Sequence, residues 1–116
     1  MRDVTLRLKD VLTAIENIEK EAHHGRTLFE TDPKVQVWML YHNQLIGEAV
    51  RSVVDELKTL NPAIPWALIV GMRHILVHNY FGIDLNEVWN VVERDMVTLK
   101  PAIIDLLAQL TDKSPH

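Results

Sequence analysis

Apolar positions recur along this chain at the spacing of helices. Between Asp3 and His24 they alternate steps of three and four residues, and the set is Val4, Leu8, Val11, Ile15, Ile18 and Ala22. This pattern indicates an amphipathic helix with one buried side. Coiled coils show a similar stripe, but in a chain of 116 residues we interpret it as one side of a helix bundle. Gly25 then ends the helix, as glycine commonly does.

A second helix is predicted from Pro33 to about Leu60, after a connection at Arg26 to Thr31 in which Phe29 anchors the chain to the core. Asp32 and Pro33 mark its start, because they combine a capping side chain with a proline at the first helical position. Its apolar set is wide: Val37, Trp38, Tyr41, Leu45, Ile46, Ala49, Val50, Val53, Val54, Leu57 and Leu60. One neighbouring helix cannot cover such a set, so this helix either lies centrally in the bundle or partly faces a second protomer.

Prolines and glycines divide the remaining chain. The run from Asn61 to Pro65 breaks the second helix, since a proline does not fit a helix interior. Pro65 begins a third predicted helix, which ends at Gly82. Asp84 to Glu87 resemble a capping box, and the fourth helix that they open uses Leu85, Val88, Trp89, Val92, Met96 and Leu99. Pro101 either kinks this helix or opens a separate terminal one.

No strand pattern of useful length is present in the sequence, so we predict an all-α fold: a bundle of four to five antiparallel helices. Residues 1–116 should form a single domain with a loose tail at 112–116. With 47% hydrophobic residues, the chain is too apolar for a disordered protein. It has no window near the ~18 continuous apolar residues that would span a membrane. Without a signal-peptide pattern and without cysteine, a cytoplasmic protein is expected.

The net charge of −4 argues against a general nucleic-acid binder, which usually carries a basic field over its surface. If the protein handles RNA, it must use a local positive patch, which a dimer can assemble.

The segment from Arg73 to Tyr80 places polar groups inside an otherwise apolar helix. Projected at ~100° per residue, Arg73 and Tyr80 share the apolar side with Trp66 and Ile69, whereas His78 lies about 140° from Arg73 on a side with Ala67, Gly71 and His74. Arginine cannot lose its charge, so a buried Arg73 requires a carboxylate, a partner subunit or a bound anion nearby.

The first of these alternatives is an ion pair between Arg73 and either Glu48 or Asp84. Glu48 follows Gly47, and a glycine inside a helix costs ~1 kcal/mol relative to alanine, so it usually marks the close approach of another backbone. Glu48 itself either pairs with a buried cation or lies exposed beside the packing glycine. A purely structural helical dimer with Arg73 neutralised by Glu48 therefore remains one interpretation.

His74 and His78 are four residues apart, as in metal-binding pairs, but the His-Glu-x-x-His pattern is absent because residue 75 is isoleucine. We therefore expect no metal and no cofactor. A histidine near a fixed arginine suits phosphate chemistry instead. The imidazole can remove a proton from a ribose hydroxyl near neutral pH, and the guanidinium can stabilise charge on the phosphoryl oxygens. The residues alone leave the substrate open.

Arg73, His78 and Tyr80 match the R-x4-H-x-Y pattern of HEPN-domain proteins of the HepT type, which this chain resembles over nearly its whole length. Further segments resemble the same family, among them Leu45 to Ala49, Ile64 to Trp66 and Val70 to Met72, followed by Phe81 to Asp84 and Val88-Trp89. The resemblance implies a helical HEPN domain that forms a homodimer, with the arginine and histidine of both protomers facing a shared cleft.

Family members with this motif are metal-independent endoribonucleases that act as toxins on RNA, in several cases tRNA. The resemblance further implies a neighbouring antitoxin, a minimal nucleotidyltransferase of the MntA type, that transfers AMP from ATP to the motif tyrosine. By position, Arg73 would hold the scissile phosphate, His78 would act as general acid or base, and Tyr80 would accept AMP. The family often has asparagine after the arginine, where this chain has His74, which would position the phosphate or only make a hydrogen bond. A non-catalytic subunit that binds the nucleotidyltransferase and supplies an anion site is the alternative.

Overall fold

The computed structural model describes residues 2–71 and 85–112, and within these ranges it consists of helices without a strand. The elements are α1 (Arg2–Ala22), α2 (Arg26–Thr31), α3 (Pro33–Ser52), α4 (Val54–Leu60), α6 (Leu85–Asn90), a π-helical segment (Val91–Asp95) and α7 (Met96–Asp112). Residues 66–71 are also helical. The prediction of an all-α bundle is confirmed. Across the described part of the chain, no helix has both the length and the apolarity needed to cross a membrane.

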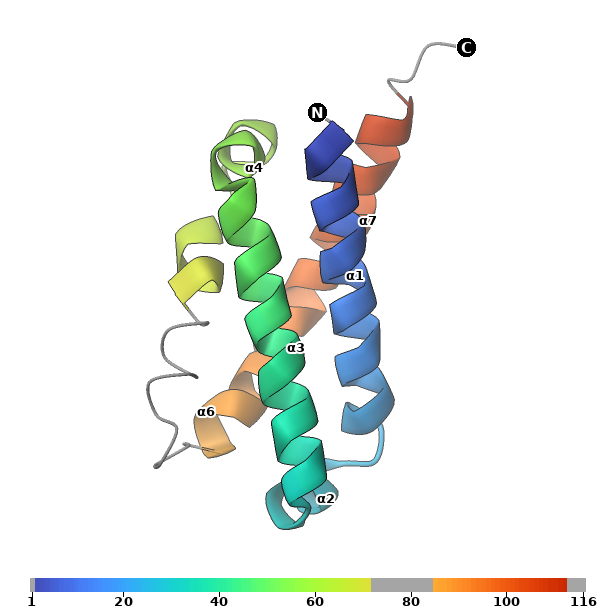
Figure 1. Ribbon diagram of the computed structural model, residues 1–116, viewed down its shortest axis with the longest axis vertical. Coiled ribbons are helices and arrows are strands. Elements are labelled where there is room, and N and C mark those ends of the chain that lie inside the picture. The colour runs from blue at the N-terminus through green and yellow to red at the C-terminus, as the bar shows by residue number, and fades with distance from the viewer. Residues whose placement is uncertain (1, 72–84, 113–116) are drawn as a thin grey trace.

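Helix α1 packs against both α3 and α7 and runs antiparallel to each of them (Figure 1). The stripe predicted from the three–four spacing is the buried side of α1: Val4, Leu8, Val11, Ile15 and Ile18 are buried, and Ala22 is partly buried against them. Gly25 has a φ of 92°, a conformation that L side chains rarely adopt. The first helix and its glycine terminus were therefore predicted correctly.

The segment between α1 and α3 differs from its prediction, because Arg26 to Thr31 form the short helix α2 instead of an irregular connection. Phe29 is nevertheless the expected anchor. Its side chain is buried, and its ring lies 5.4 Å from that of Trp89 between centroids. Helix α3 begins as predicted: the side chain of Asp32 accepts a hydrogen bond from the backbone N–H of Lys34 at 2.9 Å, and Pro33 follows at the first helical position.

The predicted helix from Pro33 to Leu60 is interrupted at Val53, which separates α3 from α4. The hydroxyl of Ser52 donates to the carbonyl of Ala49 at 2.8 Å, the oxygen to which the N–H of Val53 would donate in a continuous helix. That N–H bonds to Val50 instead, at 3.2 Å. A serine side chain that competes for a backbone carbonyl in this way bends helices. Val53 and Leu57 remain buried on either side of the break.

Residues 85–112 form one nearly continuous helical rod, from α6 through the π-helical segment into α7. Pro101 lies inside α7, so the alternative of a separate terminal helix is wrong. Proline removes one helical hydrogen bond, here the bond to the carbonyl of Val97, and because both residues are exposed water can satisfy that carbonyl. The predicted apolar positions of the fourth helix face the core: Val88, Trp89, Val92, Met96 and Leu99 are buried. The predicted tail began at residue 112, but Asp112 is the last residue of α7. The capping carboxylate predicted at Asp84 and residues 113–116 lie outside the described residues.

An ion pair also links α7 to α1, with Lys100 Nζ 2.7 Å from Glu19 Oε1. The hydrogen bond to Glu19 raises the pKa of Lys100 above its usual value. Both side chains are partly exposed, so the pair adds little stability.

Candidate functional site

The predicted motif lies outside the described residues: Arg73, His74, His78 and Tyr80 all fall within 72–84. The helix that leads into it is described at 66–71. There Trp66 and Ile69 are buried, whereas Ala67 is exposed. The start of this helix therefore has the predicted buried side, with Trp66 and Ile69, and the predicted second side, with Ala67.

The start of this helix is held firmly. The carbonyl of Pro65 accepts hydrogen bonds from the N–H groups of Leu68 and Ile69 at 3.0 and 3.2 Å, which confirms the helix start predicted at this proline. The indole N–H of Trp66 donates to the carbonyl of Asn61 at 2.8 Å, and its ring is buried. A buried aromatic side chain with a satisfied N–H fixes both position and direction. The segment 61–66 therefore sets the place from which the chain enters the motif.

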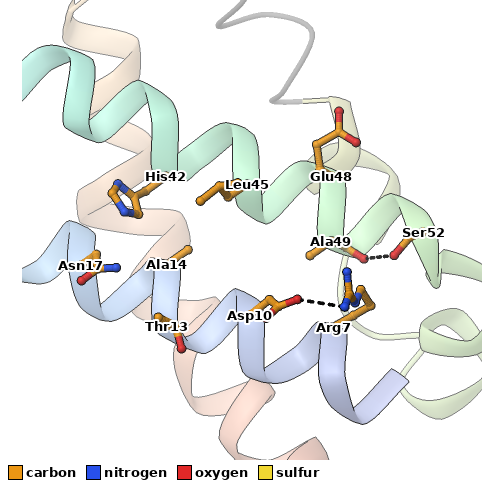
Figure 2. A pocket seen from close by; sticks show the side chains of 10 residues that line it. All are labelled: Arg7, Asp10, Thr13, Ala14, Asn17, His42, Leu45, Glu48, Ala49 and Ser52. Carbon is orange, nitrogen blue, oxygen red and sulfur yellow. Dashed lines mark hydrogen bonds and ion pairs between the residues drawn. The ribbon is translucent and has the colours of Figure 1, made fainter. Parts of the chain in front are cut away.

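Glu48 is the one predicted site residue within the described ranges. Its side chain is exposed on α3, and Figure 2 shows its carboxylate directed away from α1. Gly47 beside it is buried. These positions agree with the alternative of an exposed glutamate next to a packing glycine. The ion pair of Glu48 with Arg73 involves a residue outside the described ranges and stays a prediction.

A groove that was not predicted from the sequence runs between α1 and α3, with a volume of about 480 Å³ (Figure 2). The α1 wall is mostly polar and the α3 wall is mixed: the groove is lined by Arg7, Asp10, Thr13, Ala14, Asn17, His42, Leu45, Glu48, Ala49 and Ser52. Arg7 and Asp10 form an ion pair at 3.3 Å, and both side chains are about half exposed. Such a groove offers polar groups on both walls, with apolar surface at Ala14, Leu45 and Ala49.

His42 is the buried polar group of this groove, with 5% of its surface exposed. Its Nδ1 lies 2.8 Å from the carbonyl of Trp38, one turn earlier on α3. Its ring contacts two aromatic side chains, with centroid distances of 4.4 Å to Trp38 and 5.1 Å to Tyr41. If Nδ1 carries the proton donated to that carbonyl, Nε2 is a hydrogen-bond acceptor. In the sequence, this cluster could be recognised from the spacing of Trp38 and His42, which are four residues apart and so lie one helical turn from each other.

Trp38 connects the two walls, because its indole N–H donates to the backbone carbonyl of Asn17 at 2.8 Å. The residue is still 37% exposed. Trp38 also lines a second hollow of about 330 Å³, together with Glu21, His24, Leu28, Asp32, Lys34 and Val35. Over residues 2–71 and 85–112, no cluster of three or more histidine or acidic side chains is arranged to hold a metal ion.

Comparison with known proteins identifies related sequences over most of the chain. Residues 11–106 match the family model described as ribonuclease HepT-like. A probable ribonuclease HepT of Thermococcus cleftensis is 36% identical over 96 residues, which are 80% of this chain and 86% of that relative. A putative RNase of Methanocaldococcus jannaschii is 32% identical over 103 residues, 88% of this chain and 94% of the relative.

A third relative, a gamma-glutamylcyclotransferase and putative RNase of Methanocaldococcus jannaschii, is 34% identical over 117 residues. The match covers 99% of this chain but 52% of that longer protein. No solved structure matches the chain.

Proposed function

The chain belongs to the HepT-like ribonuclease family, and we propose that it is a metal-independent endoribonuclease, the toxin of a toxin–antitoxin pair. The observation that carries the proposal is a family match over residues 11–106, which includes Arg73, His78 and Tyr80 in the R-x4-H-x-Y pattern. Ribonuclease activity follows from the family. The toxin role, a tRNA substrate and a cytoplasmic location are parts of the proposal that go beyond the family assignment.

The proposed chemistry needs two side chains and the RNA itself. His78 takes the proton from a ribose 2′-hydroxyl, whose oxygen attacks the adjacent phosphorus while the bond to the 5′-oxygen breaks. The leaving 5′-oxygen receives a proton from a histidine imidazolium, which is the second role of imidazole in this mechanism. Arg73 stabilises the negative charge that grows on the phosphoryl oxygens. The products are a cyclic phosphate and a free 5′-hydroxyl, and no step requires a metal ion or a cofactor.

The active unit is proposed to be a homodimer, with the motif residues of both protomers facing one cleft. An exposed aliphatic side chain on the helix that leads into the motif supports such a dimer. Leu68 is 71% exposed and lies five residues before Arg73 in the sequence. A large aliphatic side chain in that position is suited to contact between two motif helices, and two copies of Arg73 concentrate positive charge in a protein whose net charge is −4.

Leu68→Glu is expected to weaken the dimer and lower RNA cleavage by at least about tenfold, because a carboxylate would have to be desolvated at the contact. Sedimentation of the variant should show monomer at concentrations where the wild type is dimeric. Val97→Glu is the matched control, since Val97 is comparably exposed on α7. A Leu68→Glu protein that stays dimeric and cuts RNA normally would contradict this dimer contact.

Tyr80 is proposed to be the site at which the antitoxin, a minimal nucleotidyltransferase of the MntA type, transfers AMP from ATP. The phenolic oxygen attacks the α-phosphorus and pyrophosphate leaves. Each added AMP places bulk and negative charge beside groups that bind a phosphate, so modification should inhibit cleavage. His74 is proposed to position the phosphate in the unmodified protein.

Intact-mass measurement after incubation with this nucleotidyltransferase and ATP should show AMP-sized additions that disappear in Tyr80→Phe. The same variant should keep cutting RNA when the antitoxin is present. Tyr41→Phe is the control, because Tyr41 is the other tyrosine of the chain. Additions that survive in Tyr80→Phe would assign the modification to another residue.

The alternative is a non-catalytic subunit that binds the nucleotidyltransferase and supplies an anion site. Incubation of purified protein with RNA in the presence of EDTA distinguishes the two. The proposed ribonuclease should cut the RNA and should depend on His78. RNA that stays intact while the nucleotidyltransferase still binds would favour the alternative.

A further inference from the structure

We propose that α3 packs antiparallel on α3 of a second copy of this chain, with the two-fold axis at Tyr41. The contact deepens the proposed function and rests on it in one respect, because it belongs to the homodimer proposed to bring two motifs to one cleft. The residues that form the contact lie on α3, outside the R-x4-H-x-Y pattern.

Helix α3 carries an exposed apolar stripe opposite its buried side. Met39 and Ile46 are buried, and at ~100° per residue the opposite side of the helix holds Val37 and Tyr41. These two side chains are 65% and 56% exposed, and Leu45, one turn further on, is 40% exposed. A helix ordinarily shows polar residues on the side away from the core. Three large apolar side chains in a row there indicate contact with another molecule.

The helices of the described residues leave this stripe open. In Figure 1 the rod from α6 to α7 crosses behind α3, and α1 lies beside α3, joined to it through Trp38. Within residues 2–71 and 85–112, eight large hydrophobic side chains are exposed, and four of them lie on α3: Val37, Trp38, Tyr41 and Leu45. Surfaces ordinarily carry such residues singly, so this concentration marks α3 as the interaction surface.

The order of residues along the stripe fits a second copy turned end to end. Val37 and Leu45 each lie four residues from Tyr41, in opposite directions. Lys34 and Glu48 each lie seven residues from it, two turns away on the same side of the helix. In an isologous contact with its axis at Tyr41, residues equally far from the axis face each other. Val37 of each copy then packs on Leu45 of the other, and the two Tyr41 side chains meet.

Charge selects the antiparallel arrangement over the parallel one. Lys34 and Glu48 are both exposed, one near each end of the stripe. Antiparallel packing places each lysine near the glutamate of the other copy, whereas parallel packing would bring like charges together. A carboxylate has two oxygens, so Glu48 can meet this lysine and keep a contact within its own protomer. The stripe therefore complements itself, which favours a second copy as its occupant.

The length of the stripe sets the expected strength of the contact. From Lys34 to Glu48, α3 rises about 21 Å, and packed helices have axes about 8–10 Å apart. A single helix pair of this length buries less than the about 800 Å² per partner of a standard interface. We therefore expect a dimer that dissociates in the micromolar range, to which the contact proposed at Leu68 also contributes.

Cysteine cross-linking tests the register directly, because the chain contains no cysteine. Tyr41→Cys should form a covalent dimer on oxidation with copper phenanthroline, since facing Cα atoms at the axis lie within the roughly 7 Å that a disulfide spans. Val37→Cys should not join to its own copy, because the two substituted positions would lie about 12 Å apart along the helix axes. A mixture of Val37→Cys and Leu45→Cys proteins should cross-link again.

Val97→Cys is the matched control for cross-linking, since Val97 is 68% exposed and lies on α7. It should react at least about tenfold more slowly than Tyr41→Cys, because only collision brings its thiols together. Equal rates for these two variants would overturn the α3 contact. Efficient cross-linking of Val37→Cys to itself would overturn the antiparallel register.

Sedimentation over a range of concentrations measures the dimer without a cross-link. Val37→Glu should raise the dissociation constant at least about tenfold, since each copy would place a carboxylate in the apolar contact. Lys34→Glu should also weaken the dimer, and Glu48→Lys added to it should restore binding. Val97→Glu is the control, and circular dichroism establishes that each variant is folded. A folded Val37→Glu protein that dimerises like the wild type would contradict the contact, and a double variant without recovery would contradict the register.

The results also separate this contact from the proposed function. A dimeric protein that cuts RNA but does not cross-link through Tyr41→Cys would overturn the α3 contact and leave the ribonuclease proposal intact. A monomeric Val37→Glu protein that cuts RNA at the wild-type rate would support the α3 contact and overturn the shared cleft. A wild-type chain that stays monomeric, and whose α3 is protected only by the nucleotidyltransferase, would assign this face to that partner and overturn the second copy.

Discussion

Replacing His78 with alanine is expected to abolish RNA cleavage while the helical fold persists. A positioned general acid–base group contributes about 10²- to 10⁴-fold to a rate, and a single imidazole that serves both the attacking and the leaving oxygen should lie toward the upper end. The assay is cleavage of labelled RNA by purified protein in EDTA, with circular dichroism to establish that the variant is folded.

His74→Ala is the matched control for this experiment. It removes an imidazole four residues earlier in the same predicted helix and should lower the rate less than His78→Ala, because His74 is proposed only to position the phosphate. Arg73→Ala should resemble His78→Ala, since no other fixed cation is expected at the scissile phosphate. Undiminished cleavage by folded His78→Ala protein would remove this histidine from the mechanism.

Phe29→Ala should strongly destabilise the fold. The side chain is buried and packs on Trp89, so it joins α2 to α6 across a long stretch of sequence. Truncation of a buried phenylalanine typically costs about 3–5 kcal/mol through lost burial and the cavity left behind. That is a large part of the ~5–15 kcal/mol that stabilises an ordinary domain. Urea unfolding should show a lower midpoint with a similar slope.

Leu6→Ala provides the comparison, because Leu6 is an exposed hydrophobic residue of α1. Its effect should stay within about 0.5 kcal/mol, as for most surface substitutions. If Phe29→Ala were no more destabilising than Leu6→Ala, Phe29 would not be the anchor of α2. Cleavage should fall in the Phe29 variant only as far as the folded fraction falls, which separates this role from that of the motif.

Several features of the fold could be predicted from local sequence because local chemistry decides them. The stripe of α1 follows from the helical period, and the start of α3 follows from a capping carboxylate before a proline. The same holds for the break at Asn61 to Pro65, where the backbone N–H of a helix interior is missing. The family could be recognised in the same way, because its R-x4-H-x-Y pattern is a local sequence feature.

Other features depended on contacts that no local rule contains. Serine is tolerated within helices, so the sequence did not indicate that the hydroxyl of Ser52 would take the carbonyl of Ala49 and end α3 before Val53. Pro101 is accommodated inside α7 because it lies on the solvent side, and which side faces solvent is decided by packing on α1. The short helix α2 forms where a connection was predicted, with Phe29 held against Trp89.

The groove between α1 and α3 shows most clearly the difference between features set by local sequence and features set by tertiary packing. The sequence by itself predicted an all-α chain of the HepT-like family, because periodicity, caps and short patterns act between near neighbours. Only the tertiary structure brought Asn17 of α1 to Trp38 and His42 of α3. Residues far apart in sequence form a surface only when the packing of α1 on α3 places them together, and that packing is a property of the whole core.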